Sequence, residues 1–182
     1  MSTDQLVGNK VDGAPALVTV VIPSYNHRQY VRAAIDSVLR QTYPAIQLVV
    51  IDDGSTDGSP ELLEALAERH GFDLVLQSNS GVCRTLNRAI REHARGRYVA
   101  LLGSDDAWTP DKIALQVARL GAAAGAEFCY SQAIAFEHDP KETRGPAFPR
   151  YPREGRVLRH VVFRQHVPAG TMLFTRSLYD AL

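Results

Sequence analysis

Two pairs of adjacent aspartates each follow a short apolar stretch of the sequence. Asp52–Asp53 comes directly after residues 47–51, and Asp105–Asp106 comes shortly after the stretch 98–102. Neighbouring carboxylates repel each other unless a cation or a hydrogen-bond donor lies between them. Carboxylate oxygens are also the ligands that hard divalent cations prefer. The two pairs therefore predict a ligand-binding and metal-binding site.

The two pairs suit different parts of a ligand. The carboxylates of Asp52–Asp53 can accept hydrogen bonds from a nucleobase imide or from ribose hydroxyls, and Gly54 allows close backbone approach. The alternative is a turn that caps the next helix, since Asp, Gly, Ser and Thr are common turn residues. Asp105–Asp106 can hold a divalent metal that bridges a diphosphate. The alternative there is an acidic cluster at the dipole of a helix opening at Thr109; two acids ahead of that cap favour the ligand role.

Short apolar stretches alternate along the chain with amphipathic ones. The apolar stretches predict strands at Leu17–Pro23, Ile46–Ile51, Asp73–Gln77, Tyr98–Leu102, Glu127–Phe136 and Thr171–Thr175. The amphipathic stretches predict helices at Tyr30–Gln41, from Ser59 to Gly71, at Val82–Arg95, from Thr109 to about Leu120, and from Arg176 onward. Ser59 as an N-cap, Pro60 at the first helical position, and Gly71 and Gly96 past helix ends fit these boundaries.

Strands separated by helices of this length predict β-α-β crossovers and a mainly parallel sheet, that is, an α/β fold. Ligands of such sheets bind outside the carboxyl ends of the strands. Four loops fall there, although they are far apart in sequence: Pro23–Asn26, Asp52–Asp53, Asn79–Gly81 and Ser104–Asp106. We therefore expect these loops to converge on one edge of the sheet.

Composition limits the classes of function. The chain has 182 residues, enough for one domain, with equal numbers of Lys plus Arg and Asp plus Glu, at 20 each. No global charge therefore draws it to nucleic acid or to an anionic membrane. No apolar stretch approaches the ~20 residues needed to span a bilayer, so at most a peripheral association with a membrane is expected. Residues 1–16 lack the apolar core of a signal peptide, and two cysteines make no disulfide framework, which favours the cytoplasm.

Several other kinds of site are excluded by missing motifs. The sequence has no GxGxxG after its first strand, no GxxxxGK[ST] phosphate loop and no GxSxG nucleophile elbow. Its histidines lack zinc-binding spacing, and Cys83 and Cys129 are interpreted as small buried hydrophobes. After Phe136 the prolines and arginines predict an irregular segment, either a flap over a site or a solvated loop.

Five motifs in register resemble the family 2 glycosyltransferases. They are VTVVIPSYN (18–26), SVLRQTYP (37–44), VIDDGSTDGS (50–59), NSG (79–81) and LLGSDD (101–106). The match runs from Leu17 to about Leu120, and residues 169–178 resemble the acceptor half of the family. The resemblance implies a GT-A-type nucleotide-sugar-binding fold, with a mainly parallel central sheet flanked by helices.

The resemblance also implies a function and a set of site residues. Members transfer a sugar from a nucleoside-diphosphate sugar to a hydroxyl acceptor, a glycan or a lipid-linked saccharide, by metal-dependent inverting displacement. It implies Mn²⁺ or Mg²⁺ as cofactor, held by Asp106 with Asp105. The implied donor-binding residues are Pro23, Ser24, Tyr25, Asn26, Asp52, Asp53, Gly54, Asn79, Gly81, Arg84, Ser104 and Asp105.

The chain departs from the family pattern at three places. Gly103 stands where many members carry the first Asp of Asp-x-Asp-Asp. Thr85–Asn87 replaces Ala-Arg-Asn, so a phosphate-facing arginine is missing, and Arg84 is the candidate substitute or an exposed helix residue. The general base of the family lies beyond the strand and helix at residues 172–182, so it is expected beyond Leu182. Asp180 is expected on a helix surface.

These features predict three segments: a flexible N-terminal segment (1–16), a nucleotide-sugar-binding subdomain (17–136), and the incomplete start of an acceptor-binding subdomain (137–182). The predicted protein is a glycosyltransferase in the cytoplasm or at the inner face of the membrane. The alternative is a noncatalytic nucleotide-sugar-binding module that lacks the general base. A coding sequence that continues past Leu182 into an acidic motif would favour the enzyme.

Overall fold

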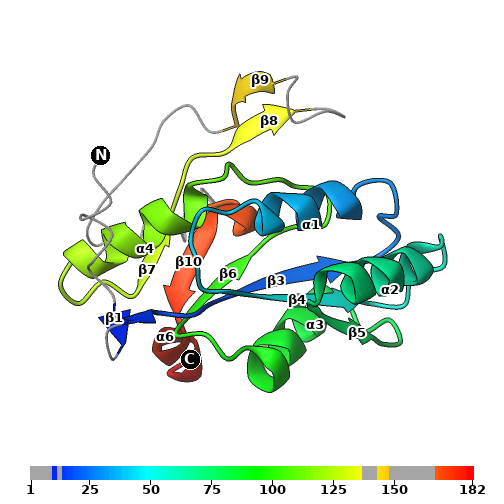
Figure 1. The fold of residues 1–182 in the computed structure, drawn as a ribbon, viewed down its shortest axis with the longest axis horizontal. Helices are drawn as coiled ribbons and strands as arrows, with labels where there is room; N and C mark the ends of the chain where they lie inside the picture. Colours follow the sequence, from blue (N-terminus) through cyan, green and yellow to red (C-terminus); the bar gives the residue numbers. More distant parts are fainter. Residues whose placement is uncertain (1–9, 12–13, 137–142, 148–166) are drawn as a thin grey trace.

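The protein is built around a six-stranded sheet (Figure 1). A computed structural model describes residues 10–11, 14–136, 143–147 and 167–182. The strand order is β5-β4-β3-β6-β10-β7. The strands are β3 (Val18–Ser24), β4 (Ile46–Asp52), β5 (Asp73–Leu76), β6 (Tyr98–Leu101), β7 (Phe128–Tyr130) and β10 (Met172–Thr175).

Four neighbouring strands are parallel, and the last two are not. Strand β3 pairs in parallel with β4 on one side and with β6 on the other, and β4 pairs in parallel with β5. Strand β10 then inserts antiparallel between β6 and β7, with Leu173 opposite both Ala100 and Cys129. The expected mainly parallel sheet of an α/β fold is therefore confirmed.

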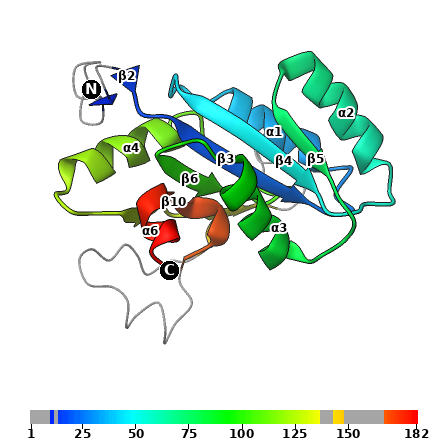
Figure 2. The same cartoon turned by 90° about the horizontal axis from the view of Figure 1, so that it is seen from below.

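Helices cover both faces of the sheet (Figures 1 and 2). One face packs on α1 (Val31–Leu39), α2 (Ser59–His70) and α4 (Lys112–Ala122) through alternate β3 residues such as Val18 and Val20. The other face, which includes Val21, packs on α3 (Val82–Arg88), on the π-helix η2 (Ala89–His93) and on Tyr179 of α6 (Arg176–Asp180). Burial on both faces explains why β3 and β4 read as continuous apolar runs.

The predicted N-terminus of α2 was wrong by one residue. Gly58, with a φ of 82°, is the N-cap, and Ser59 is the first helical residue. The reason is Asp57, whose Oδ1 accepts hydrogen bonds from the Ser59 backbone N (3.0 Å) and Oγ (2.6 Å). The predicted end is confirmed, because Gly71 caps α2 with a φ of 73°.

Gly96 does not cap the preceding helix, which ends as the π-helix η2 at His93 with Ala94 as its C-cap. Instead Gly96 packs against the backbone: a Cβ there would lie 2.6 Å from the Thr19 N and 2.7 Å from the Tyr98 O. A tight approach therefore requires glycine at this position.

Thr109 is not the N-cap of α4, which begins at Lys112 after Asp111. A residue that follows α1, Gln41, caps the start of α4 instead. The Gln41 side chain accepts a hydrogen bond from the Ile113 N (3.0 Å) and donates one to the Thr109 O (2.7 Å). A side chain 72 residues away in sequence thus satisfies a donor of the first turn.

The single strand predicted at 127–136 was wrong. Its first part is β7, which joins the main sheet, while β8 (Ile134–Phe136) pairs with β9 (Thr143–Pro146) in a separate two-stranded sheet. Most of the segment predicted as a flap or solvated loop lies outside the described residues. The same holds for residues 1–9; β1 (Lys10–Val11) pairs with β2 (Ala14–Pro15).

Among the described residues, no helix has both the length and the apolar character needed to cross a bilayer. Cys129 is half-buried, but Cys83 is exposed, so its interpretation as a buried hydrophobe was wrong. Asp180 lies on the α6 surface as expected, where its Oδ1 accepts a hydrogen bond from the Arg176 Nε at 2.8 Å.

Candidate functional site

The predicted loops meet at the carboxyl edge of the parallel strands. The backbone N of Asp53, after β4, donates to the Ser24 O of β3 (2.8 Å). The backbone N of Gly81, after β5, donates to the Asp53 Oδ2 (2.9 Å). The loop after β6 joins through the Ser104 Oγ, which lies 2.7 Å from the His27 Nδ1. All four loops are therefore connected by hydrogen bonds.

The first acidic pair is satisfied by donors of the protein itself. The two oxygens of Asp52 accept hydrogen bonds from the Ser55 N (2.8 Å) and Oγ (2.6 Å). The Asp53 Oδ1 accepts from the Gln77 Nε2 (2.7 Å) and the Ser80 N (2.9 Å). The two carboxylates therefore turn to different loops, and each is held in place.

The environment of Asp53 stabilises its charged form. Asp53 is only 4% exposed, and this burial by itself would raise its pKa. Hydrogen bonds from Gln77, Ser80, Thr85 and Gly81 outweigh the burial, so that the pKa is lowered. In the described part of the chain its Oδ2 accepts a hydrogen bond from the Gly81 N, and a carboxylate oxygen has two lone pairs. This oxygen can therefore accept a further hydrogen bond.

Glycine at position 54 is required by space as well as by conformation. Gly54 has a φ of 79°, and a Cβ there would lie 2.7 Å from the Asn79 N. The Asp53–Gly54 turn is thereby pressed against the loop that contains exposed Asn79 and Gly81. Gly81 also has a positive φ, of 87°, but its surroundings are open.

The loop after β3 contains a residue that is hydrogen-bonded to a neighbouring loop and a residue that is exposed to solvent. Asn26 has a φ of 54°, and its side-chain Oδ1 accepts from the Thr56 N while its backbone N donates to the Ser55 Oγ, both at 2.8 Å. Tyr25 is 49% exposed, and Pro23 is half-buried. The Ser24 Oγ is buried and has no recorded partner within the described part of the chain. An unpaired buried hydroxyl next to Asp52 and Asp53 suits a site that takes a polar ligand.

The second acidic pair lacks such donors. Within the described residues, no hydrogen bond to the side chain of Asp105 or Asp106 is recorded, and both residues are exposed. The Asp106 carboxyl group nonetheless points inward, and its burial together with the charge of Asp105 raises its pKa. A Cβ at Gly103 would lie 2.9 Å from both the Asp105 Oδ1 and the Asp106 Oδ2. The two carboxylates therefore converge on the space that Gly103 leaves free.

This arrangement fits a divalent cation at Asp105–Asp106 rather than at Asp52–Asp53. Two unpaired, converging carboxylates repel each other, and a cation between them would remove the repulsion. No cluster of three or more His, Cys, Asp or Glu that could hold a metal occurs among the described residues. The remaining oxygens would therefore come from a ligand or from water, as is usual for Mg²⁺ with phosphates.

Three residues that the sequence reasoning did not single out contribute to the site. His27 connects the loop after β3 to Ser104. Gln77 holds Asp53, and the Arg88 Nη1 donates to the Gln77 Oε1 at 2.8 Å.

The predicted site residue Arg84 is exposed on the first turn of α3, with no contact to either acidic pair recorded in the described structure. Among the missed residues, Gln77 could have been suspected from the sequence, because it is the last residue of the strand predicted there and so lies at the carboxyl end of β5.

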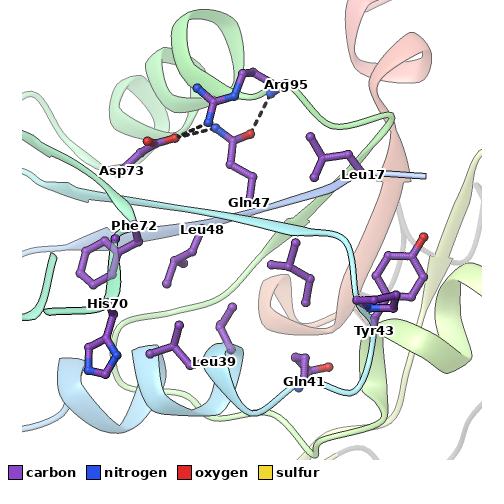
Figure 3. A pocket seen from close by; sticks show the side chains of 14 residues that line it. Leu17, Leu39, Gln41, Tyr43, Gln47, Leu48, His70, Phe72, Asp73 and Arg95 are labelled. Carbon is purple, nitrogen blue, oxygen red and sulfur yellow. Dashed lines mark hydrogen bonds and ion pairs between the residues drawn. The ribbon is translucent and has the colours of Figure 1, made fainter. Parts of the chain in front are cut away.

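A cavity of about 430 Å³ lies at the opposite edge of the sheet (Figure 3). Its lining includes Tyr43, Leu48 and Phe72, with an ion pair between the Arg95 Nη2 and the Asp73 Oδ2 at 3.0 Å (Figure 3). Gln47 donates to the same Asp73 oxygen at 2.7 Å. Arg95, Asp73 and Gln47 bond to each other there (Figure 3), and ligands of parallel sheets bind at the other edge. We therefore place the candidate site at the carboxyl ends.

Comparison with known proteins identifies a family. The profile of "Glycosyl transferase family 2" matches residues 19–181. The putative teichuronic acid biosynthesis glycosyltransferase TuaG of Bacillus subtilis is 43% identical over 104 residues, which cover 56% of this chain and 40% of TuaG. The putative glycosyltransferase EpsH of the same organism is 35% identical over 95 residues, covering 52% of this chain and 27% of EpsH.

Solved structures share the fold. Mannosyltransferase PcManGT from Pyrobaculum calidifontis, in complex with GDP-Man and Mn²⁺, superposes with a TM-score of 0.66 at 24% identity, covering 98% of this chain and 51% of that one. A TarS fragment from S. aureus in complex with UDP-GlcNAc gives a TM-score of 0.68 at 19% identity, covering 91% and 47%. This chain therefore spans about half of these structures, and less than half of the curated relatives described above.

Proposed function

Because this chain belongs to glycosyltransferase family 2, we propose that it binds a nucleoside-diphosphate sugar for transfer of the sugar to a hydroxyl acceptor. The single observation that carries the proposal is the contrast between its two acidic pairs. One pair is held by internal donors and orders the loops, whereas the other has no recorded donor among the described residues and converges on the space beside Gly103. A donor molecule needs both a rigid nucleoside pocket and a cation for its diphosphate.

The distance between the pairs suits such a molecule. Strands β4 and β6 flank β3, so that Asp53 and Asp106 follow strands two spacings apart, which is roughly 10 Å. We assign the nucleoside to Pro23, Tyr25, Asp52 and Asp53. The Asp53 Oδ2 and the Ser24 Oγ are the groups with free hydrogen-bonding capacity there.

The diphosphate is assigned to the other side, at Ser104, Asp105 and Asp106. A divalent cation, Mn²⁺ or Mg²⁺, would neutralise charge on the departing diphosphate when bound. The protein contributes the two carboxylates and keeps them converging through the small residues Gly103 and Gly170. The assignment is supported by two proteins of similar fold, PcManGT, which was solved with GDP-Man and Mn²⁺, and TarS, which was solved with UDP-GlcNAc.

The inverting displacement needs a general base for the acceptor hydroxyl. We propose that this base comes from residues beyond Leu182, because none of the assigned site carboxylates is free for that role: Asp52 and Asp53 are held, and Asp105 and Asp106 would hold the cation. The acceptor is a saccharide or a lipid-linked saccharide at the cytoplasmic side, in keeping with the biosynthetic role named for TuaG.

Thermal unfolding with UDP, GDP or dTDP in the presence of Mn²⁺ tests the donor site. A nucleotide at about 100 times its Kd stabilises the native state by about 2.7 kcal/mol. For a chain of this size the melting temperature should then rise by about 5–10 °C. EDTA should remove most of the shift.

Absence of a shift with every nucleotide would refute the donor site. A shift that EDTA leaves unchanged would refute the metal part alone. A noncatalytic binding module would give the same shifts, and it would differ by failing to transfer sugar even when the residues following Leu182 are present.

A further inference from the structure

Three side chains at regular spacing bind three consecutive backbone carbonyls. The Trp108 Nε1 donates to the Gly170 O (2.6 Å), and the Gln116 Nε2 donates to the Thr171 O (2.7 Å). The Lys112 Nζ donates to the Met172 O (3.4 Å). Lys112 and Gln116 are four residues apart and lie on one side of α4, whereas Trp108 lies in the loop that precedes the helix. We call these three residues the α4 clamp.

Lys112 and Gln116 of the clamp are buried, Trp108 is half-buried, and Lys112 contacts the Trp108 ring. The Lys112 Nζ lies 3.7 Å from the centroid of the Trp108 ring, a cation–π arrangement. Lys112 is 7% exposed and Gln116 is 6% exposed. A lysine this deep in the protein is costly to bury, and a bond to one strand carbonyl does not need a charged donor. The residue is therefore better explained by a role in positioning than by stability.

The clamped segment lies directly against the second acidic pair. A Cβ at Gly170 would lie 3.0 Å from the Asp106 Oδ2, the same oxygen that faces Gly103. The Asp106 Oδ2 thus lies beside two glycines, Gly103 and Gly170. The clamp holds Gly170 through the hydrogen bond from Trp108. Movement of the 170–172 segment away from α4 would widen the space into which the Asp106 carboxylate points.

We propose that Trp108, Lys112 and Gln116 are positioning residues that hold the 170–172 segment against Asp106 and so set the affinity of Asp105–Asp106 for a divalent cation. This inference rests on the proposed function for its ligand, but the geometry of the clamp does not depend on it. The clamp belongs to no residue set assigned above to the donor.

Two clamp variants and one matched control test the proposal. Lys112→Met keeps the length of the side chain but removes the donor, and Gln116→Glu keeps the shape but removes the amide donor. Leu115→Met changes an exposed residue of the same helix and serves as control. For each variant, the affinity for Mn²⁺ is measured in the presence of UDP and, separately, the affinity for UDP in EDTA.

The clamp variants should bind Mn²⁺ about tenfold more weakly or worse, as is usual when groups that orient metal ligands are removed. Their affinity for UDP in EDTA should stay within about twofold of the original protein, because the nucleoside pocket is held by other bonds. The control should match the original protein in both measurements. Unchanged Mn²⁺ affinity in both folded clamp variants would overturn the proposal.

Hydrogen exchange separates this proposal from the proposed function. Amides of residues 102–107 and 169–172 should exchange faster in Lys112→Met, whereas those of residues 52–58 should not change. This result is expected even if UDP does not bind, which would refute only the donor site. If neither clamp variant folds, Gly170→Ala replaces them, because its added Cβ would lie close to the Asp106 Oδ2. This variant should also weaken Mn²⁺ binding. An unchanged Mn²⁺ affinity would overturn the inference.

Discussion

Each aspartate pair is defined by what surrounds its oxygens. Asp52 and Asp53 have similar sequence surroundings to Asp105 and Asp106, because both pairs come at or soon after the end of an apolar strand. Serine and backbone donors occupy the oxygens of the first pair, but no recorded donor in the described part of the chain reaches the second. Identical chemical groups therefore have different surroundings: the first pair orders the loops, and for the second pair we propose cation binding.

Asp106→Asn should have two effects of opposite sign. It removes the repulsion from Asp105, so that the unliganded protein should melt at a slightly higher temperature. It also removes a proposed metal ligand, so that the Mn²⁺-dependent part of nucleotide binding should weaken by about tenfold or more. Thermal unfolding with and without Mn²⁺ and UDP measures both effects. An Mn²⁺-dependent shift equal to that of the original protein would rule out Asp106 as a ligand.

At this scale the sequence predicted the acidic residues but not their partners. Aspartates after strands can be recognised from local pattern alone. His27, Gln77 and Arg88 could not, because their role depends on which loops meet in space. Arg84 was chosen for its position in the motif, and the structure shows it exposed, with Arg88 one turn later bonded to Gln77 instead.

Among the elements, the tight turn between β4 and α2 packs closely against the loop that follows the edge strand β5. Gly54 fits between Asp53 and the 77–79 loop with no room for a methyl group. The turn can therefore be tested by adding a single carbon atom.

Gly54→Ala should destabilise the protein more than Gly71→Ala. Both glycines have left-handed φ angles, of 79° and 73°, so that alanine costs about 1 kcal/mol at each for conformation. Only at Gly54 would the new Cβ collide, at 2.7 Å from the Asn79 N, whereas nothing lies within 4 Å at Gly71. An additional 1–3 kcal/mol, roughly, is expected for Gly54→Ala. Denaturant unfolding of the two variants gives the difference; equal losses would contradict the close packing.

The elements themselves were predicted well where their signals are local. Strands β3, β4 and β6 and helices α1 and α2 agree with their apolar patterns to within one or two residues. The errors arise from distant contacts. Gln41 rather than Thr109 caps α4, and Gly96 packs on Thr19 rather than capping a helix. Strand β10 pairs with only the first part of the predicted fifth strand.

For the whole molecule, the buried Lys112 makes stability depend on pH. Burial lowers the pKa of Lys112 to about 7, and Cys129, the titratable neighbour on β7, raises it slightly. In the unfolded chain a lysine keeps its proton up to about pH 10.4. Between about pH 7 and 10 the unfolded state therefore binds more protons, and stability should rise with pH. Below pH 7 the full cost of the buried charge is present.

Lys112→Met should remove this dependence. From pH 7 to 8.5 the unfolding free energy of the original protein should rise relative to that of the variant by about 1 kcal/mol per pH unit. The window ends there because Cys129, whose pKa is raised to about 11 by burial, contributes an opposite slope above pH 9. Parallel curves for the two proteins over this range would show that Lys112 stays charged in the fold.

Of the six strands in the main sheet, the one that joins β6 to β7 is also the latest in the sequence. Strands β6 and β7 follow each other in sequence, yet they meet only through β10, which begins more than 40 residues after β7. During synthesis the four parallel strands can assemble once residue 101 has emerged, while β7 has no partner until residue 175. The strands that lead to the proposed nucleoside pocket therefore precede β10 in translation, whereas the proposed cation site gains Gly170 beside Asp106 only when the segment before β10 has been made.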